Sequence, residues 1–186
     1  MPHRLLVVSN RLPIVLEKKD DGWTLKPGSG GLVSALAPVL SHRGGLWVGW
    51  PGMSLERSGL ERSGSWEKVL EEGYREQGYE LVPVLLSESE VRGFYEGFAN
   101  GILWPLFHDM LGRCNFDPSF WYAYLEVNDK FAAAVSEHSR EGDFIWVQDY
   151  QLIHVAELLR RRNETARVGF FLHIPFPPLD IFLRLP

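Results

Sequence analysis

Residues 144–172 read FIWVQDYQLIHVAELLRRRNETARVGFFL, and this stretch carries the pattern that decides the fold. It predicts a strand at Phe144–Val147, a helix at Leu152–Arg162 and a second strand at Val168–Leu172. Both strands are continuous apolar runs rather than alternating ones, which is typical of strands buried on both faces of a parallel sheet. A strand, a helix and a strand in succession form the unit from which such sheets are built.

The rest of the chain continues this alternation, with a first strand at Leu5–Val8 and another at Leu46–Trp50. The chain is therefore expected to have an α/β fold, with a doubly wound, mostly parallel, Rossmann-like sheet in one domain over residues 1–186. Between these strands we expect a hairpin (14–16 and 23–25), a surface loop (53–65), a helix (66–77) and a strand (80–86). Three further helices have a start signal in the sequence: Gly28–Gly31, the capping box Ser87–Glu90, and Asp117-Pro118. The first of these helices carries Leu32, Leu36, Val39 and Leu40 on one face, and the last carries Phe120, Tyr124, Val127, Phe131 and Val135 in one stripe.

Composition argues against several classes of protein. Hydrophobic residues make up 45% of the 186 residues and charged residues 23%, an ordinary globular balance. The net charge is −5, and the only basic triplet, Arg160–Arg162, falls at a helix end where cations favour the helix dipole. A nucleic-acid partner is therefore not expected.

Cysteine and hydropathy patterns give the expected compartment. Cys114 is the only cysteine, which excludes an intrachain disulfide and a cysteine-based metal site. The six histidines are not spaced as zinc ligands, so no metal is predicted. No stretch has the length of a membrane span or the form of a signal peptide, so no membrane partner is expected. These features predict a soluble, cytoplasmic protein.

Ligands of doubly wound sheets bind beyond the carboxyl ends of the strands, so polar residues at those ends are candidate site residues. Arg11 follows the first strand, and Gly28–Gly31 opens a helix whose free N–H groups suit an anion; together they indicate a phosphorylated ligand. The alternative is a glycine-rich turn beside a surface arginine. Asp149 follows the strand at 144–147 and suits sugar hydroxyls or a base role, the alternative being a helix N-cap.

Three further residues are weaker candidates by themselves. His173 follows the strand at 168–172 and precedes a proline-rich loop that would hold it in place, although a lone histidine can equally be structural. Tyr95 and Trp104 fall at helical spacing among apolar residues, which favours packing in the core. Taken together, the strand-end groups point to a phosphorylated polyol or sugar as ligand, with no metal and no cofactor required.

Six blocks of sequence, in order and in register, resemble the trehalose-6-phosphate synthase family. They are SNRLP (9–13), GGL (30–32), GWPG (49–52), LWPLFH (103–108), WVQDY (146–150) and GFFLHIPFP (169–177). The resemblance implies the N-terminal half of a GT-B glycosyltransferase, in which two Rossmann-like domains face a cleft. It also implies transfer of glucose from UDP-glucose to glucose 6-phosphate with retention at the anomeric carbon.

The resemblance also implies roles for individual residues. Arg11, Tyr95 and Asp149 match residues that hold glucose 6-phosphate, with Arg11 on the phosphate. Gly30 and Gly31 match the loop that lies against the donor. Trp104 and His173 match residues lining the meeting point of the two sugars, and with Asp149 they form the catalytic candidates. For Tyr95 and Trp104 the resemblance reverses the core interpretation.

The mechanism that the resemblance implies has no carboxylate nucleophile; UDP departs on the front face, and its phosphate helps to deprotonate the acceptor hydroxyl. Gln148 and Gln151 depart from the family, which often has histidines at these positions.

The C-terminal domain that would bind most of UDP-glucose is expected to be absent from this chain, which would leave it incomplete for catalysis. The cleft face that this domain would cover is then exposed, and such a face would favour a homo-oligomer. Two alternatives stay open: a different phosphorylated acceptor, such as a glycerol phosphate or a pseudo-sugar phosphate, and a non-catalytic subunit that senses a sugar phosphate.

Overall fold

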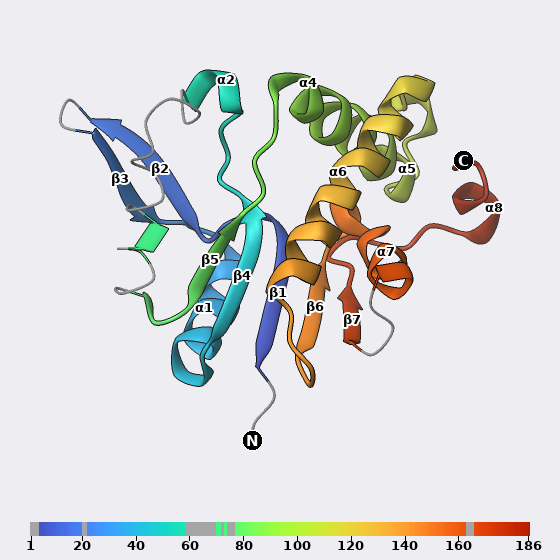
Figure 1. The fold of residues 1–186 in the computed structure, drawn as a ribbon. Helices are drawn as coiled ribbons and strands as arrows, with labels where there is room; N and C mark the ends of the chain where they lie inside the picture. The colour runs from blue at the N-terminus through green and yellow to red at the C-terminus, as the bar shows by residue number, and fades with distance from the viewer. Residues whose placement is uncertain (1–3, 20–21, 59–69, 72, 74–76, 163–165) are drawn as a thin grey trace.

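The computed structural model describes residues 4–19, 22–58, 70–71, 73, 77–162 and 166–186, and a five-stranded parallel sheet lies at its centre (Figure 1). The strand order is β5-β4-β1-β6-β7, so β1 occupies the middle. A separate antiparallel hairpin pairs β2 with β3. The strands are β1 (Leu5–Arg11), β2 (Ile14–Lys19), β3 (Gly22–Pro27), β4 (Gly45–Trp50), β5 (Glu80–Pro83), β6 (Phe144–Gln148) and β7 (Arg167–Phe171).

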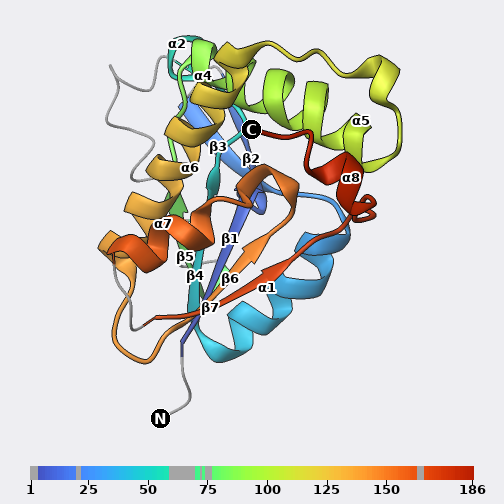
Figure 2. The same cartoon turned by 90° about the vertical axis from the view of Figure 1, so that its right-hand side faces the viewer.

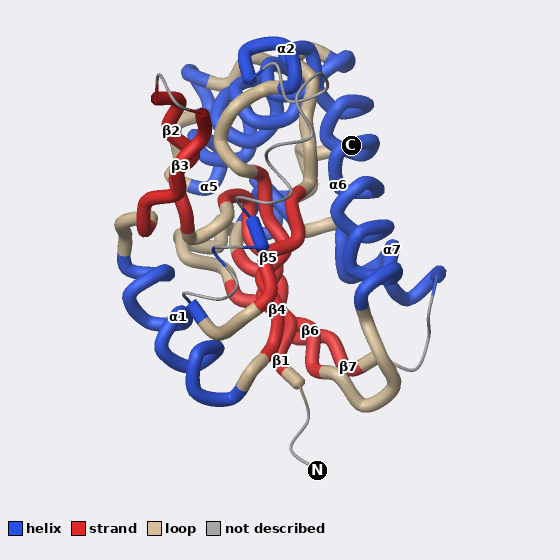
Figure 3. Tube along the Cα trace, turned by 60° about the vertical axis from the view of Figure 1, so that its left-hand side comes forward, coloured by secondary structure: helices blue, strands red, loops and turns tan. Residues whose placement is uncertain are grey.

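Both faces of β1 and β4 are buried, as their apolar runs predict. The same expectation was wrong for β7, an edge strand on which Phe170 and Phe171 are exposed. In β1, Leu6 and Val8 enter one core cluster, whereas Leu5 and Val7 enter the other. Side chains of a strand alternate between its faces, so each apolar pair must be covered separately. Figures 2 and 3 show α1 (Gly31–Arg43) on one side of the strands, and α6 (Pro118–His138) with α7 (Val155–Arg162) on the other. The predicted doubly wound α/β class is confirmed.

The other helical segments are short, apart from one π-helix. Ser87 accepts a hydrogen bond from the Glu90 amide, and the Glu90 carboxylate accepts one from the Ser87 amide, so the predicted capping box is confirmed. No helix in the described part of the chain is long and apolar enough to cross a membrane. The segments are α2 (Leu55–Ser58), α4 (Glu88–Glu90), the π-helix η2 (Val91–Leu103), α5 (Trp104–Phe107), the 3₁₀ turns η3 (Leu111–Arg113) and η4 (Tyr150–Leu152), and α8 (Leu179–Phe182).

Several predicted boundaries need correction. The expected loop at 53–65 contains helix α2 at residues 55–58, and residues 59–65 lie outside the described residues. The strand expected at 80–86 ends at Pro83, which has no N–H to donate to a ladder. Val39 is 38% exposed, because the buried side of α1 runs through Leu36 and Leu40 instead. Most of the helix expected at 66–77 lies outside the described residues.

The strand order places a ligand site at one end of the sheet. From β1 the sheet extends through β4 and β5 on one side and through β6 and β7 on the other. The order therefore reverses between β1 and β6, where a crevice opens beyond the carboxyl ends of the strands. Arg11 ends β1, and Asp149 directly follows β6, so both reach this crevice.

Candidate functional site

A cavity of about 460 Å³ lies at this reversal point and is lined by most of the predicted site residues. It brings together residues that are far apart in the sequence, from the ends of β1, β6 and β7, the start of α1 and the η2 helix. Of the described residues that line it, Asp149 is the only carboxylate. The predicted site residues on its wall are Arg11, Gly30, Gly31, Tyr95, Asp149 and His173.

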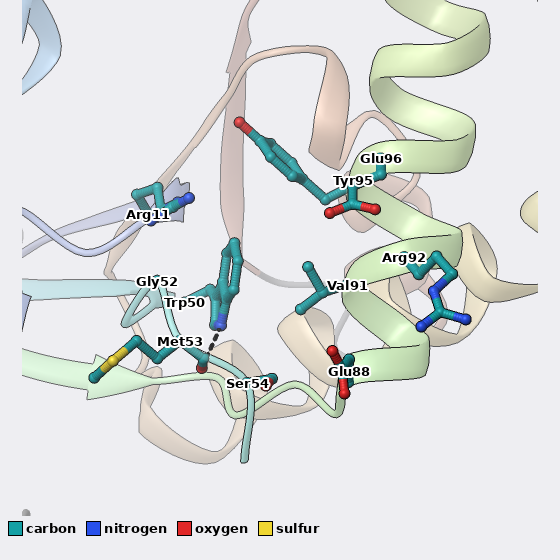
Figure 4. A pocket seen from close by; sticks show the side chains of 10 residues that line it. All are labelled: Arg11, Trp50, Gly52, Met53, Ser54, Glu88, Val91, Arg92, Tyr95 and Glu96. Atoms are coloured by element: carbon teal, nitrogen blue, oxygen red, sulfur yellow. Dashed lines mark hydrogen bonds between the residues drawn. The ribbon is translucent and has the colours of Figure 1, made fainter. Parts of the chain in front are cut away.

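The Arg11 guanidinium lies beside two aromatic rings that also contact each other. Its guanidinium carbon is 4.3 Å from the centre of the Trp50 ring and 5.8 Å from that of Tyr95, and the two rings are 5.9 Å apart. In Figure 4 the Tyr95 side chain extends from η2 toward Arg11. Within the described residues Arg11 forms no ion pair. Because the aromatic faces hold the cation without neutralising it, its charge is available to an anion.

A second cavity, of about 330 Å³, lies on the Gly52 side of Arg11 and also borders Tyr95 (Figure 4). Gly52 has a φ of 95°, and a Cβ atom there would lie 2.3 Å from Nη1 of Arg11. The Trp50 indole donates a hydrogen bond to the Met53 carbonyl at 2.9 Å, which fixes the ring beneath the arginine. The turn after β4 therefore makes room for the Arg11 side chain and supports it.

The backbone of Arg11 is held by a buried serine. Ser9 Oγ donates to the Arg11 carbonyl at 2.7 Å and accepts a hydrogen bond from the Trp47 indole, also at 2.7 Å. The register of β1 against β4 shifts between Val8 and Arg11, so the strand is irregular where it enters the site. Such irregularities commonly re-aim a side chain beside a binding site.

The glycine loop leaves open space at the start of α1. Gly30 has a φ of 131° and provides no side-chain cap, and Cβ atoms at Gly30 and Gly31 would meet nothing within 4 Å. At Gly28, by contrast, a Cβ would lie 2.8 Å from the Pro13 carbonyl carbon, so the loop packs closely against the connection between β1 and β2. The open, uncapped helix N-terminus presents backbone N–H groups to the cavity, an arrangement suited to an anion.

Asp149 has a strained backbone, and its side chain accepts hydrogen bonds from two backbone amides. Its φ is 72°, in the left-handed region that non-glycine residues seldom occupy. Its Oδ1 accepts hydrogen bonds from the amides of Tyr150, at 3.0 Å, and His173, at 3.1 Å. The capping alternative is thus correct in part, because Asp149 caps the 3₁₀ turn that follows β6. The same contacts tie the β6 end to the β7 end, and such strain often marks functional sites.

Two tyrosines that the sequence did not single out support the turn after Asp149. The Tyr124 hydroxyl donates to the Tyr150 carbonyl at 2.9 Å and accepts from the Ile153 amide at 3.2 Å. The Tyr150 hydroxyl donates to Asn100 on η2 at 2.8 Å. Burial, followed by the negative charge of Asp149, raises the pKa of Tyr150 to about 12. The sequence placed Tyr124 in the apolar stripe of its helix, and it placed Tyr150 only at a strand end, in the block at 146–150.

Amide side chains form the floor of the larger cavity. Gln148 is 1% exposed, and its Oε1 lies 3.0 Å from Nε2 of His173. Nε2 of Gln148 and Oδ1 of Asn10 are buried without a hydrogen-bond partner among the described residues. Native proteins leave few such atoms, and those that remain call for an explanation. Asn10 was not predicted; its place beside Arg11 at a strand end was the available signal.

Trp104 stands apart from the other predicted site residues. It lines neither cavity, is 37% exposed, and stacks on His108 with ring centres 4.2 Å apart. The core packing expected from its helical spacing is therefore wrong, because Trp104 lies on the outer side of the first turn of α5. Tyr95 is half-buried, packs against the core and also lines both cavities, so the core expectation is correct in part.

The fold and the cavity together define a Rossmann-like α/β domain with a polar ligand site at the reversal point of its sheet. The chain belongs to glycosyltransferase family 20, whose sequence model matches residues 3–186. It is 44% identical over 97% of its length to a trehalose-6-phosphate synthase of Mycolicibacterium gilvum and 43% identical to one of Mycobacterium tuberculosis. The chain spans 35% of the length of each of these relatives.

Solved structures agree with the sequence relatives. A trehalose-6-phosphate synthase structure from E. coli bound with UDP-2-fluoro glucose matches 98% of this chain with a TM-score of 0.75 and 34% identity. A synthase from Burkholderia xenovorans in complex with glucose-6-phosphate matches with a TM-score of 0.72 and 32% identity, also over 98% of this chain. This chain covers 36% of each of those structures.

Proposed function

We propose that this chain forms the acceptor-binding side of a trehalose-6-phosphate synthase, which transfers glucose from UDP-glucose to glucose 6-phosphate with retention. The observation that carries the proposal is the Arg11 guanidinium, held on Trp50 without an ion pair among the described residues and facing a cavity that also contains Asp149. Arg11 binds the phosphate, because a guanidinium offers forked, permanently charged donors. Asp149 and Tyr95 hold the sugar hydroxyls.

The glycine loop takes the donor side of the same cavity. Gly30 and Gly31 leave space at the N-terminus of α1, where backbone N–H groups would stabilise the negative charge of a nucleotide sugar. A relative whose structure was solved with UDP-2-fluoro glucose supports this assignment. His173, two residues after β7, lines the same cavity, and we assign it to the meeting point of the two sugars. Trp104 lines neither cavity, and its assignment to the meeting point of the two sugars rests on the resemblance alone.

The chemistry we infer depends on positioning rather than on a covalent sugar intermediate. A retaining double displacement needs two carboxyl groups about 5 Å apart across the sugar, and Asp149 is the only carboxylate among the described residues on the wall of the larger cavity. We take the front-face scheme from the resemblance to the family: the acceptor attacks on the face that UDP leaves, and its hydroxyl proton passes to the departing phosphate. In this scheme the chain lowers the barrier by orienting the acceptor and by stabilising charge.

An acceptor panel tests the proposal on residues 1–186. Calorimetric titration with glucose 6-phosphate should give saturable binding, whereas glucose should bind at least about 10-fold more weakly because it lacks the charge-assisted contacts to Arg11. Glycerol 3-phosphate and inorganic phosphate complete the panel, since they carry phosphate without the sugar ring. Tighter binding of glycerol 3-phosphate than of glucose 6-phosphate would contradict the assignment of a glucose acceptor.

The proposal also concerns what residues 1–186 do alone. Because the chain spans 35% of the length of the synthases it matches, we propose that it binds acceptor but does not transfer glucose without the remainder of such an enzyme. Incubation with UDP-glucose and glucose 6-phosphate should release no UDP above the background rate. Turnover by the 186-residue chain would contradict this part of the proposal.

A further inference from the structure

The imidazole of His173 is held from two sides. Its Nε2 lies 3.0 Å from Oε1 of Gln148, the last residue of β6, which is 1% exposed. The Phe171 ring lies 4.7 Å from the imidazole, centre to centre. A buried amide on a central part of the sheet has little freedom to move, so this contact constrains the direction of the imidazole ring.

The backbone of His173 is held by Asp149, the residue after Gln148 at the end of β6. The His173 amide donates to Oδ1 of Asp149 at 3.1 Å, and the Asp149 amide donates to the Phe171 carbonyl at 2.7 Å. Gln148 and Asp149 therefore hold both the ring and the backbone of His173. This double attachment connects the ends of β6 and β7 on the wall of the larger cavity.

The Gln148 contact also indicates which ring nitrogen carries the proton, because the Gln148 atom that faces the ring is the amide oxygen. An amide oxygen only accepts hydrogen bonds, so a neutral His173 must donate from Nε2, and Nδ1 is left as the acceptor. We propose that Gln148 is a positioning residue that fixes His173 in its Nε2–H tautomer, so that Nδ1 accepts a hydrogen bond from a ligand hydroxyl. The second half of this statement rests on the proposed function; the tautomer does not.

Nitrogen NMR of the ligand-free chain, labelled with ¹⁵N-histidine, tests the tautomer directly. The variant His173→Gln identifies the His173 signals among those of the six histidines. We expect a single neutral form with protonated Nε2 and a ring proton protected from exchange with water. Gln148→Met keeps a similar volume but removes the acceptor, so the ring proton should exchange rapidly and the second tautomer should appear.

Gln151 provides a matched control. It is 8% exposed and lines the same cavity, and it makes no hydrogen bond to His173. Gln151→Met should therefore leave the His173 spectrum unchanged. Protonation of Nδ1 in the wild-type chain, or an unchanged spectrum in Gln148→Met, would overturn the proposal. If Gln148→Met does not fold, the wild-type spectrum still decides the matter.

Titration with glucose 6-phosphate separates the two halves of the proposal. If Nδ1 accepts from the acceptor sugar, Gln148→Met should weaken binding about 5-fold, the effect of one neutral hydrogen bond. A confirmed tautomer with unchanged affinity would overturn the role toward the ligand. If the wild-type chain does not bind glucose 6-phosphate at all, the result counts against the proposed function. The tautomer of His173 can still be measured in that case.

Discussion

Arg11 is the residue around which the site is arranged. Its charge lies 4.3 Å above Trp50 and has no acidic partner within the described residues. Contact with an aromatic face stabilises a cation by about 0.5–2 kcal/mol, and it leaves the guanidinium hydrogens free to bind an anion. An ion pair in the same place would have to be broken before a phosphate could bind.

Gly52 should affect phosphate binding through Arg11. Gly52→Ala places a methyl group 2.3 Å from Nη1 of Arg11, too close for both to stay in place, and it also strains a backbone with a φ of 95°. We expect a stability loss of about 1–3 kcal/mol from the backbone and binding of glucose 6-phosphate about 10-fold weaker from the displaced guanidinium. Chemical denaturation and calorimetry measure the two effects separately.

Gly44→Ala is the matched control. Gly44 has a φ of 72°, and a Cβ there would meet nothing within 4 Å. This variant should lose similar stability and keep the affinity of the wild-type chain. Equal losses of affinity in both variants would show that backbone strain, and not contact with Arg11, is responsible.

Asp149 should be sensitive to the shape of the replacing side chain. Asn keeps a side-chain oxygen that can accept the capping hydrogen bonds, so Asp149→Asn should fold with a small stability loss. Asp149→Ala loses the cap and keeps the strain, and should cost about 2 kcal/mol. Urea unfolding of the two variants checks the order; equal stabilities would contradict the role given to Oδ1.

At the scale of elements, α6 is the main support of one sheet face. Phe131 on this helix is fully buried, whereas Tyr122 on the same helix is 69% exposed. Phe131→Ala should reduce the free energy of unfolding by about 3–5 kcal/mol because it leaves a cavity, and Tyr122→Ala should change it by less than about 0.5 kcal/mol. Denaturant midpoints of the two variants test which face of α6 meets the sheet.

The turn after β6 should weaken in alkali. Burial raises the pKa of Tyr150 to about 12, so the folded state holds this proton more tightly than the unfolded state, whose tyrosines titrate near 10. The stabilisation is complete below about pH 10 and is lost as the pH rises from about 10 to 12. Tyr150→Phe should lower the slope of stability against pH in this window, although buried Tyr79 and Tyr124 keep part of it. An unchanged slope would contradict the burial of the Tyr150 hydroxyl.

The periodicity of apolar residues predicted where helices lie better than it predicted their type. The stripe from Tyr124 to Val135 gave α6 and its buried face, because a long helix repeats its pattern several times. The same reasoning indicated a helix after residue 90 but not its π-helical form, in which the Trp104 amide donates to the Ala99 carbonyl five residues back. Helix types with such close side-chain periods cannot be separated over so short a segment.

The rule that ligands bind beyond the carboxyl ends of the strands predicted more of the site residues than any other feature of the sequence. It placed Arg11, Asp149 and His173 together, because carboxyl ends of parallel strands meet at one edge. The support from Gly52 could not be predicted, since it depends on where the Arg11 side chain lies in space. Trp104 shows the opposite limit: its apolar neighbours indicated burial, but it lies on the outer side of the first turn of α5.

At the scale of the whole molecule, one sheet end gathers an arginine without an ion pair, an open helix N-terminus and a single carboxylate, as far as the described residues show. This combination fits a phosphorylated sugar held beside a nucleotide sugar, and it agrees with membership of glycosyltransferase family 20. The homo-oligomer expected from the sequence stays a prediction. Sedimentation of the 186-residue chain at several concentrations would test it, and a single monomeric species throughout would contradict it.

The most direct measurement is calorimetric titration of glucose 6-phosphate into the wild-type chain, Arg11→Ala and Arg43→Ala. Arg43 is exposed in the last turn of α1, at the opposite end of that helix from the cavity, so its removal controls for net charge. Arg11→Ala should weaken binding about 10–100-fold, and Arg43→Ala should leave it unchanged. Equal affinities for all three proteins would contradict the claim that Arg11 binds the phosphate of the acceptor.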